Sequence, residues 1–300
     1  MNYRFLRFPY GKIKAVTLSY DDGCHQDIRF SKILNKYGLK GTFNLNSSWI
    51  GNNSTGRHYT VNGEKMPMHY MSADEIREHI LAHGHEIALH GENHKANGKL
   101  RSIEGIQEIL NCRLSLEKEF GIIVRGLAYP DSGINHFCNG TTFESIKQYL
   151  KELDIAYARS LNSVSGNMDL FADPYCWNPT IYHASPNIIA HIDKFLSFDP
   201  KAVTFQRRLP KIFFFWGHTY EFDERDNWDS AEEICEKLGG KDDIWYATNI
   251  EICNYINAYH SLIFSADSTI VYNPTVTTVW FETKSAIYKI SPNETLKIKE

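Results

Sequence analysis

The chain has 300 residues, of which 42% are hydrophobic and 23% are charged, a composition that excludes a disordered chain or a coiled coil. Lysine and arginine total 32 against 36 acidic residues, so the net charge is −4. Because no basic excess exists to neutralise a phosphate backbone, we expect no nucleic-acid partner.

Short apolar runs alternate along the chain with segments of helical periodicity. We predict seven strands, over residues 15–20, 41–46, 86–90, 123–129, 155–159, 211–217 and 244–248. We predict helices over residues 27–38, 72–84, 102–121, 141–154, 187–196, 230–240 and 248–262. Strands that are apolar throughout and separated by helices indicate an α/β fold with a parallel sheet covered on both faces.

About seven strands suit a closed or partly closed barrel as well as an open doubly wound sheet. No G-x-G-x-x-G follows the first strand, which argues against a dinucleotide-binding fold. Beyond residue 264 the runs STIVYNP, TVTTVWFET and SAIYKI are β-branched and aromatic. We therefore predict a barrel over residues 1–263 and a small β appendage, packed on it, over 264–300.

The chain also lacks the sequence features of a membrane protein or a disulfide framework. No segment approaches the roughly 20 apolar residues that cross a membrane, and the N-terminal residues lack the apolar run of a signal peptide. We expect a cytoplasmic protein with no membrane partner. The six cysteines include no Cys-x-x-Cys pair, which favours reduced thiols. The sequence does not indicate the oligomeric state.

Polar residues stand where the predicted strands end. In chain order they are Asp21, Asp22, Asn44, Asn46, His90, His94, Tyr129, Pro130, Arg159 and His218. A parallel barrel carries its chemistry at the carboxyl ends of its strands, so we expect these side chains to meet at one rim.

Two of these histidines, His90 and His94, are four residues apart. Two imidazoles and one carboxylate, with open positions for water, form a common catalytic zinc or iron site. Asp22 supplies the carboxylate and leaves Asp21 free to act as a base, although an Asp-Asp-Gly run on its own also fits a turn. A second pair with the same spacing begins at His79, inside a predicted helix, and we interpret it as a solvent-exposed helix face.

Four motifs in this order carry a family resemblance: SYDDG at 19–23, GHEIALHGENH at 84–94, LAYPDSG at 127–133 and FFFWGHTYEFD at 213–223. Over most of residues 12–260 the chain resembles the polysaccharide deacetylases of the NodB-homology type, carbohydrate esterase family 4. The resemblance implies a distorted (β/α) barrel, in agreement with the strand count.

The resemblance also implies the roles of the rim residues. Asp21 matches the catalytic base and His218 the general acid, and Glu221 or Asp223 could orient the imidazole of that acid. The implied metal ligands are Asp22, His90 and His94. They imply one divalent ion, Zn²⁺ in the first place, with Co²⁺, Ni²⁺ or Fe²⁺ as alternatives.

The chain departs from the family pattern at the third motif. The family usually places an arginine beside the proline, in contact with the base, and Ala128-Tyr129-Pro130 has none. Arg125 lies earlier on the same strand, whereas Arg159 ends the next strand and could take that place. A tryptophan of the family's fourth motif matches Trp177 poorly.

The implied reaction is the metal-assisted hydrolysis of an acetyl group on an N-acetylated or O-acetylated carbohydrate. The candidate substrate-binding residues are Tyr129, Pro130, Arg159, Trp177 and Tyr220, although packing explains the aromatic ones equally well. The first alternative is an acetyl-xylan-type esterase, or a hydrolase of another small amide or imide. The second is a non-catalytic carbohydrate-binding barrel, which would have no use for a complete base, acid and ligand set.

Overall fold

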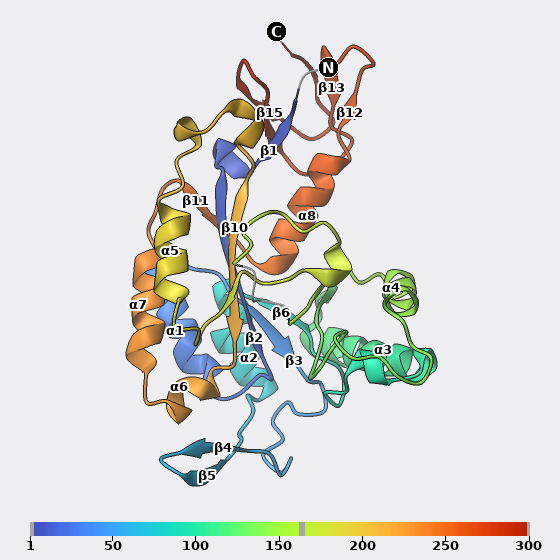
Figure 1. Ribbon diagram of the computed structural model, residues 1–300. Coiled ribbons are helices and arrows are strands. Elements are labelled where there is room, and N and C mark those ends of the chain that lie inside the picture. Colours follow the sequence, from blue (N-terminus) through green and yellow to red (C-terminus); the bar gives the residue numbers. More distant parts are fainter. Residues whose placement is uncertain (1–2, 162–165, 299–300) are drawn as a thin grey trace.

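A single eight-stranded parallel sheet forms the centre of the computed structural model, which describes residues 3–161 and 166–298 (Figure 1). The strands follow the order β8-β7-β6-β3-β2-β10-β9, and β11 also pairs with β2. In chain order they are β2 (Lys14–Asp21), β3 (Thr42–Leu45), β6 (Glu86–Leu89), β7 (Gly126–Ala128), β8 (Tyr157–Arg159), β9 (Ile181–Tyr182), β10 (Lys211–Gly217) and β11 (Ile244–Tyr246). The predicted barrel of about seven parallel strands is confirmed, and β9 is an additional strand.

Strand β2 lies at the middle of the sheet, and all eight of its residues are buried. Strand β10 pairs with it along one edge, from Lys14 to Tyr20. Two strands share the other edge: β11 pairs with residues 14–16 and β3 with residues 19–21. A strand buried on both faces and both edges needs an apolar sequence, which explains the continuous run AVTLSY.

The segment from Trp177 to Tyr182 joins the two ends of the strand order. The Trp177 amide donates a hydrogen bond to the carbonyl of Ala158 in β8 at 3.0 Å, and the Ser160 amide donates to the carbonyl of Trp177 at 3.1 Å. A few residues later β9 pairs in parallel with β10. This irregular seam lets the sheet curl into a distorted barrel.

The described residues form eight α-helices, and these cover the sheet. They are α1 (Asp27–Tyr37), α2 (Ala73–His79), α3 (Ser102–Phe120), α4 (Phe143–Glu152), α5 (Ile188–Leu196), α6 (Tyr220–Glu224), α7 (Trp228–Leu238) and α8 (Asn249–His260). Figure 1 shows α1, α5 and α7 on one side of β2 and β10, with α3 and α4 on the far side. The predicted capping box of α2 is present, because Ser72 and Glu75 bond to each other's backbone amides.

A hairpin that the sequence analysis did not predict lies between β3 and α2. It consists of β4 (His58–Val61) and β5 (Glu64–Pro67), which pair antiparallel. The turn residues Asn62 and Gly63 have φ of 50° and 84°, the positive values that a two-residue hairpin turn requires. The hairpin projects beyond the ends of β2 and β3 and contacts α6 through a bond from the Thr60 amide to Glu224 at 3.0 Å (Figure 1).

The C-terminal region forms short antiparallel strands in two sheets, which have the orders β12-β13-β16 and β1-β14-β15 and of which the second includes a strand from the start of the chain. They are β1 (Phe5–Arg7), β12 (Ile263–Phe264), β13 (Ile270–Tyr272), β14 (Val279–Glu282), β15 (Ile287–Ile290) and β16 (Thr295–Lys297). The structure therefore places β1, near the N-terminus, in one sheet with the C-terminal strands. The division at residue 264 stays a prediction, and residues 1–2, 162–165 and 299–300 of the two predicted ranges lie outside the described residues.

Within the described ranges, no helix combines the length and apolarity needed to cross a membrane.

Candidate active site

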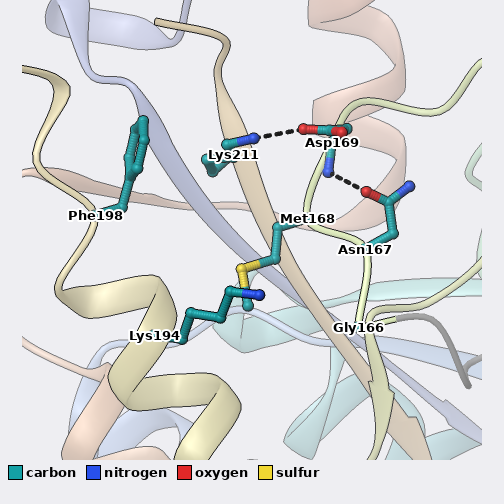
Figure 2. Close-up of a pocket in the computed structure, with 7 residues that line it drawn as sticks. All are labelled: Gly166, Asn167, Met168, Asp169, Lys194, Phe198 and Lys211. Carbon is teal, nitrogen blue, oxygen red and sulfur yellow. Dashed lines mark hydrogen bonds and ion pairs between the residues drawn. The ribbon is translucent and has the colours of Figure 1, made fainter. Parts of the chain in front are cut away.

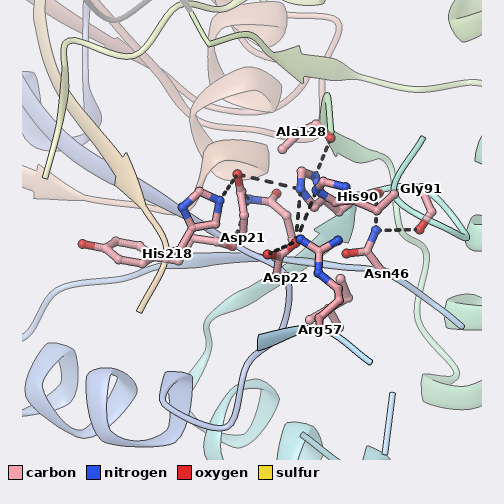
Figure 3. Close-up of polar contacts among 12 residues, drawn as sticks. Asp21, Asp22, Asn46, Arg57, His90, Gly91, Ala128 and His218 are labelled. Atoms are coloured by element: carbon pink, nitrogen blue, oxygen red, sulfur yellow. Dashed lines mark hydrogen bonds and ion pairs between the residues drawn. The ribbon is translucent and has the colours of Figure 1, made fainter. Parts of the chain in front are cut away.

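Asp21 ends β2 and lies buried among polar partners at the rim of the barrel (Figure 3). Nη2 of Arg159 donates to Oδ2 of Asp21 at 2.5 Å, and Nδ2 of Asn44 donates to Oδ1 at 2.8 Å. Nε2 of His218 lies 3.9 Å from the same Oδ2. Burial raises the pKa of Asp21, but the positive charge of Arg159 and its neighbours outweighs burial, so the pKa lies below its ordinary value. The carboxylate is therefore ionised near neutral pH.

Arg159 reaches Asp21 from β8, across the curl of the barrel. Its side chain is fully buried, and its guanidinium lies 4.7 Å above the ring of Trp216. The structure thus brings to the aspartate the arginine that was expected to replace the one missing from the third motif. Arg125 instead bonds to Asp154 near the surface at 2.8 Å.

Asp22, His90 and His94 form a cluster beside Asp21, called here the ligand triad. One ligand-type atom of each lies within 4.8 Å of the others. Nε2 of His90 and Nε2 of His94 lie 3.7 and 3.5 Å from Oδ1 of Asp22. Nδ1 of His90 is 2.9 Å from the carbonyl oxygen of Ala128 (Figure 3). That nitrogen therefore carries the proton, and Nε2 turns its lone pair toward Asp22.

The ligand triad has the properties of a divalent cation site. Burial lowers the pKa of both histidines, that of His94 to about 4, so their imidazoles are neutral as metal ligands must be. Oδ1 of Asp22 is buried and has no hydrogen-bond partner among the described residues. Two neutral imidazoles around an unpartnered carboxylate oxygen are a donor set that fits such an ion.

Glu108, which sequence reasoning missed, holds the loop between the two histidines. This buried residue of α3 accepts bonds at Oε1 from the amide of Asn93 at 2.6 Å and from the amide of Lys95 at 3.3 Å. Helix α3 therefore anchors the residues on both sides of His94. Its periodicity predicted a helix, but no sequence pattern indicated which of its acids would turn inward.

His218 follows β10 directly and lies on the other side of Asp21 (Figure 3). Its Nδ1 is 3.4 Å from Oε1 of Glu221, one turn further along the chain. Burial lowers the pKa of His218, but the contact with Glu221 and the charges of Asp22 and Asp21 outweigh burial and raise the pKa to about 9. The imidazolium is therefore the form present at neutral pH. Asp223, the other candidate partner, instead accepts a bond from Nε1 of Trp228 at 2.8 Å.

The predicted substrate residues differ in where the structure places them. Tyr220 is at the site, with its ring centroid 5.2 Å from that of His218. Tyr129 and Pro130 are buried at the end of β7, and the Tyr129 hydroxyl donates to the carbonyl of Tyr175 at 2.9 Å. Tyr220 is thus partly exposed beside His218, whereas the Tyr129–Pro130 pair is buried.

The structure does not bring Trp177 to the site. Its side chain is 2% exposed and packs in the interior against Tyr157, Phe171 and Phe214, with ring centroids 4.8 to 5.6 Å away. A ring that stacks on a sugar needs an exposed face, which this position lacks. Trp177 thus packs in the seam, which is the packing explanation that the sequence analysis left open.

Two residues of the segment before the hairpin, Trp49 and Arg57, also reach the site. The Trp49 ring stacks on His94 at 5.3 Å, and the Arg57 guanidinium lies 4.4 Å above the Trp49 ring. Nη2 of Arg57 is 4.0 Å from Oδ2 of Asp22 (Figure 3). Sequence reasoning missed both residues because they lie in the loop after β3, beyond the last residue of the predicted strand, and form no recognisable motif.

A separate cavity of about 540 Å³ lies at the other end of β10 (Figure 2). Its lining residues are Gly166, Asn167, Met168, Asp169, Lys194, Phe198 and Lys211. Lys211 begins β10, whereas His218 follows its last residue. No predicted site residue lines this cavity.

Comparison with known proteins gives one match to a family model. Residues 9–153 match the family model described as polysaccharide deacetylase. The predicted resemblance and the enzyme class, a carbohydrate deacetylase, are thereby confirmed. The matched residues include Asp21 and the ligand triad, whereas Arg159 and His218 lie after the last matched residue.

Two solved structures are similar to this chain, and the first of them supports the fold. A protein from Mycobacterium smegmatis named as a polysaccharide deacetylase is 15% identical, with a TM-score of 0.54 over 87% of this chain and 96% of that chain. The chitin deacetylase of the fungal pathogen Colletotrichum lindemuthianum is 15% identical, with a TM-score of 0.48 over 81% of this chain and 87% of that chain. No match is found among curated proteins.

Proposed function

We propose that this protein is a metal-dependent hydrolase that removes acetyl groups from an N-acetylated or O-acetylated carbohydrate. The observation that carries the proposal is the position of Asp21, which lies between Arg159 and His218 and next to the ligand triad. The family match supports an acetylated carbohydrate as the substrate.

The ligand triad would hold one divalent ion. Zn²⁺ suits two imidazoles and one carboxylate, and Co²⁺, Ni²⁺ and Fe²⁺ accept the same donors. When bound, such an ion polarises an acyl carbonyl and lowers the pKa of a water molecule at that place.

Asp21 and His218 would carry the two proton transfers of the hydrolysis. Asp21, kept ionised by Arg159, accepts a proton from the attacking water as its oxygen bonds to the acetyl carbon. His218, protonated at neutral pH, donates the proton on Nε2 to the departing nitrogen or oxygen as its bond to that carbon breaks. Because the atoms of the two groups approach to 3.9 Å, both reach one acetyl group.

Replacement of Asp21 by asparagine tests this proposal, because asparagine preserves size and removes the base. We expect Asp21→Asn to retain the metal and to lose acetate release from acetylated glycans by about a hundredfold or more. Asp74→Asn, on the exposed start of α2, is the matched control and should behave as wild type. Loss of metal together with activity would make Asp21 a ligand, and undiminished acetate release would exclude it as the base.

A further inference from the structure

A chain of buried polar side chains runs from His218 back into the barrel. Oε2 of Glu221, the residue in contact with His218, lies 2.9 Å from Nε2 of His183. Nδ1 of His183 in turn lies 2.9 Å from the hydroxyl of Tyr20. His183 is 2% exposed and Tyr20 is fully buried. Because Tyr20 precedes Asp21 in β2, the chain connects the strand of the proposed base with the proposed acid.

The protons of this chain can be placed from donor and acceptor properties. The Tyr20 hydroxyl donates its single proton to Nδ1 of His183, which is then an acceptor. Burial lowers the pKa of His183, so its imidazole is neutral and has its proton on Nε2, directed at Glu221. Burial raises the pKa of Glu221, but its contacts with His183 and His218 outweigh burial and lower the pKa. Glu221 is thus an ionised acceptor for Nε2 of His183 and an ion-pair partner of His218 at 3.4 Å.

The local sequence makes room for this arrangement. His183 follows β9 directly, and its amide donates to the carbonyl of Trp216 in β10 at 2.8 Å. A side chain at Gly217 would place its Cβ 2.3 Å from Nδ1 of His183, so only glycine allows the ring to lie there. Phe222 covers the imidazole, with ring centroids 4.4 Å apart. The imidazole is therefore fixed in position and cannot rotate away from Glu221.

We propose that His183 and Tyr20 are positioning residues of the deacetylase. They hold the Glu221 carboxylate 3.4 Å from Nδ1 of His218, so that the imidazolium is stabilised and the proton on its Nε2 faces the leaving group. This inference rests on the proposed function, in which His218 is the acid. Neither His183 nor Tyr20 touches the substrate, and both act through Glu221.

The inference predicts a defect in the leaving-group step alone. Replacement of His183 by leucine removes the donor to Glu221 and should lower kcat on N-acetyl substrates about tenfold with KM unchanged, a part of the 10²–10⁴-fold contribution of a general acid. His183→Gln, whose amide can donate to Glu221, should restore most of that loss. Tyr20→Phe removes the hydroxyl that bonds to His183 and leaves the contact between His183 and Glu221 in place. It should therefore lower kcat by only about threefold, a small part of the contribution of a general acid.

The alkaline limb of the pH–rate profile gives a second measurement. The charged groups facing His218 are Asp21 and Asp22 from the end of β2 and Glu221 from α6. A Glu221 carboxylate that is held less firmly beside Nδ1 stabilises the imidazolium less, so the pKa of His218 falls and the limb moves to lower pH. Glu221→Gln should produce the largest displacement, His183→Leu a smaller one, and His183→Gln almost none.

The experiment titrates the His218 imidazole by NMR in full-length protein with ¹³C-labelled histidine, beside acetate-release kinetics. His85→Leu is the matched control, because His85 is also buried but directly precedes β6, whereas His218 follows the end of β10. This change should leave the His218 titration unchanged. A lower His218 pKa in His183→Leu, restored in His183→Gln, supports the inference even if wild type releases no acetate. An unchanged His218 titration in folded His183→Leu and Tyr20→Phe overturns it, even if wild type is an active deacetylase.

Discussion

Asp21 and Asp22 are adjacent residues of the same type with opposite surroundings. Asp21 accepts hydrogen bonds from Arg159 and Asn44, whereas Oδ1 of Asp22 has only the neutral imidazoles of the triad nearby. The left-handed backbone at Asp22, with φ of 80°, turns the two carboxylates in different directions. In the proposed reaction, one turn of the chain would therefore supply both the base, Asp21, and a metal ligand, Asp22.

The ligand triad gives a prediction that does not depend on activity. Asp22→Ala or His94→Ala removes one of three donors and should abolish most metal binding, measured by elemental analysis of purified protein. His79→Ala is the control, because His79 belongs to the other histidine pair, on α2. Equal metal content in all three variants would show that the ligand triad does not bind the metal.

The buried pair of Arg159 and Asp21 gives a prediction about stability. Arg159→Met leaves a buried carboxylate without its cation and should lower the free energy of unfolding by about 3 to 5 kcal/mol. Urea denaturation measures the change. Because asparagine carries no charge, adding Asp21→Asn to Arg159→Met should recover part of the loss. A double variant less stable than Arg159→Met would show that the charge of Asp21 is not the cause.

His218 gives a prediction about the bond that is cleaved. An amine cannot leave without a proton, whereas an alkoxide departs with less help. His218→Ala should therefore lose acetate release from N-acetyl substrates toward the upper end of about 10²–10⁴-fold and from O-acetyl esters toward the lower end. Both substrates are assayed at equal metal content. Equal losses would assign His218 to a different step, and a wild type that cleaves only esters would favour the esterase alternative.

Among the elements, the segment before the hairpin adds a cation at the mouth of the site. Arg57 stacks on Trp49 and lies 4.0 Å from Asp22, beyond hydrogen-bond distance, so its N–H groups are available to a ligand. We expect Arg57→Met to raise KM about tenfold for acetylated glycans that carry a carboxylate, because a hydrogen bond to a charged group is lost.

Neutral acetylated glycans of the same length are the comparison substrate for Arg57. Their KM should change little in Arg57→Met, and Arg57→Lys should retain part of the preference for the anionic substrate. An equal rise in KM for both substrates would show that Arg57 supports the Trp49 ring rather than the bound glycan.

The elements that the sequence analysis predicted and those it missed differ in length and in hydrophobic pattern. All seven predicted strands are present because each is a distinct apolar run. Asp21, the ligand triad and His218 could be predicted because they lie where these runs end. Strand β9 has only two residues, too few for periodicity, so His183 after it went unnoticed. The hairpin contained an Asn62-Gly63 turn signal, but its strands are mostly exposed and lack apolar alternation.

At the scale of the whole molecule, the two ends of the chain are joined by one buried ion pair. Arg7 in β1 is 1% exposed, and its Nε donates to Oε2 of Glu282 in β14 at 2.7 Å. Glu282→Ala leaves the buried guanidinium unpaired and should lower the free energy of unfolding by about 3 to 5 kcal/mol. Glu232→Ala, which breaks an exposed pair with Lys36, should cost about 1 kcal/mol or less. Similar losses of unfolding free energy in Glu282→Ala and Glu232→Ala would show that the buried pair of Arg7 and Glu282 contributes no more than an exposed one.

The central position of β2 has a consequence for how the protein is synthesised. Strand β2 lies near the start of the chain, but its long edge is covered by β10, about 200 residues later. At roughly 5–20 residues per second, a ribosome needs about 10–40 s between the two strands. During that interval an apolar strand leaves the exit tunnel with one side unpaired, a surface that chaperones bind and that other nascent chains can join.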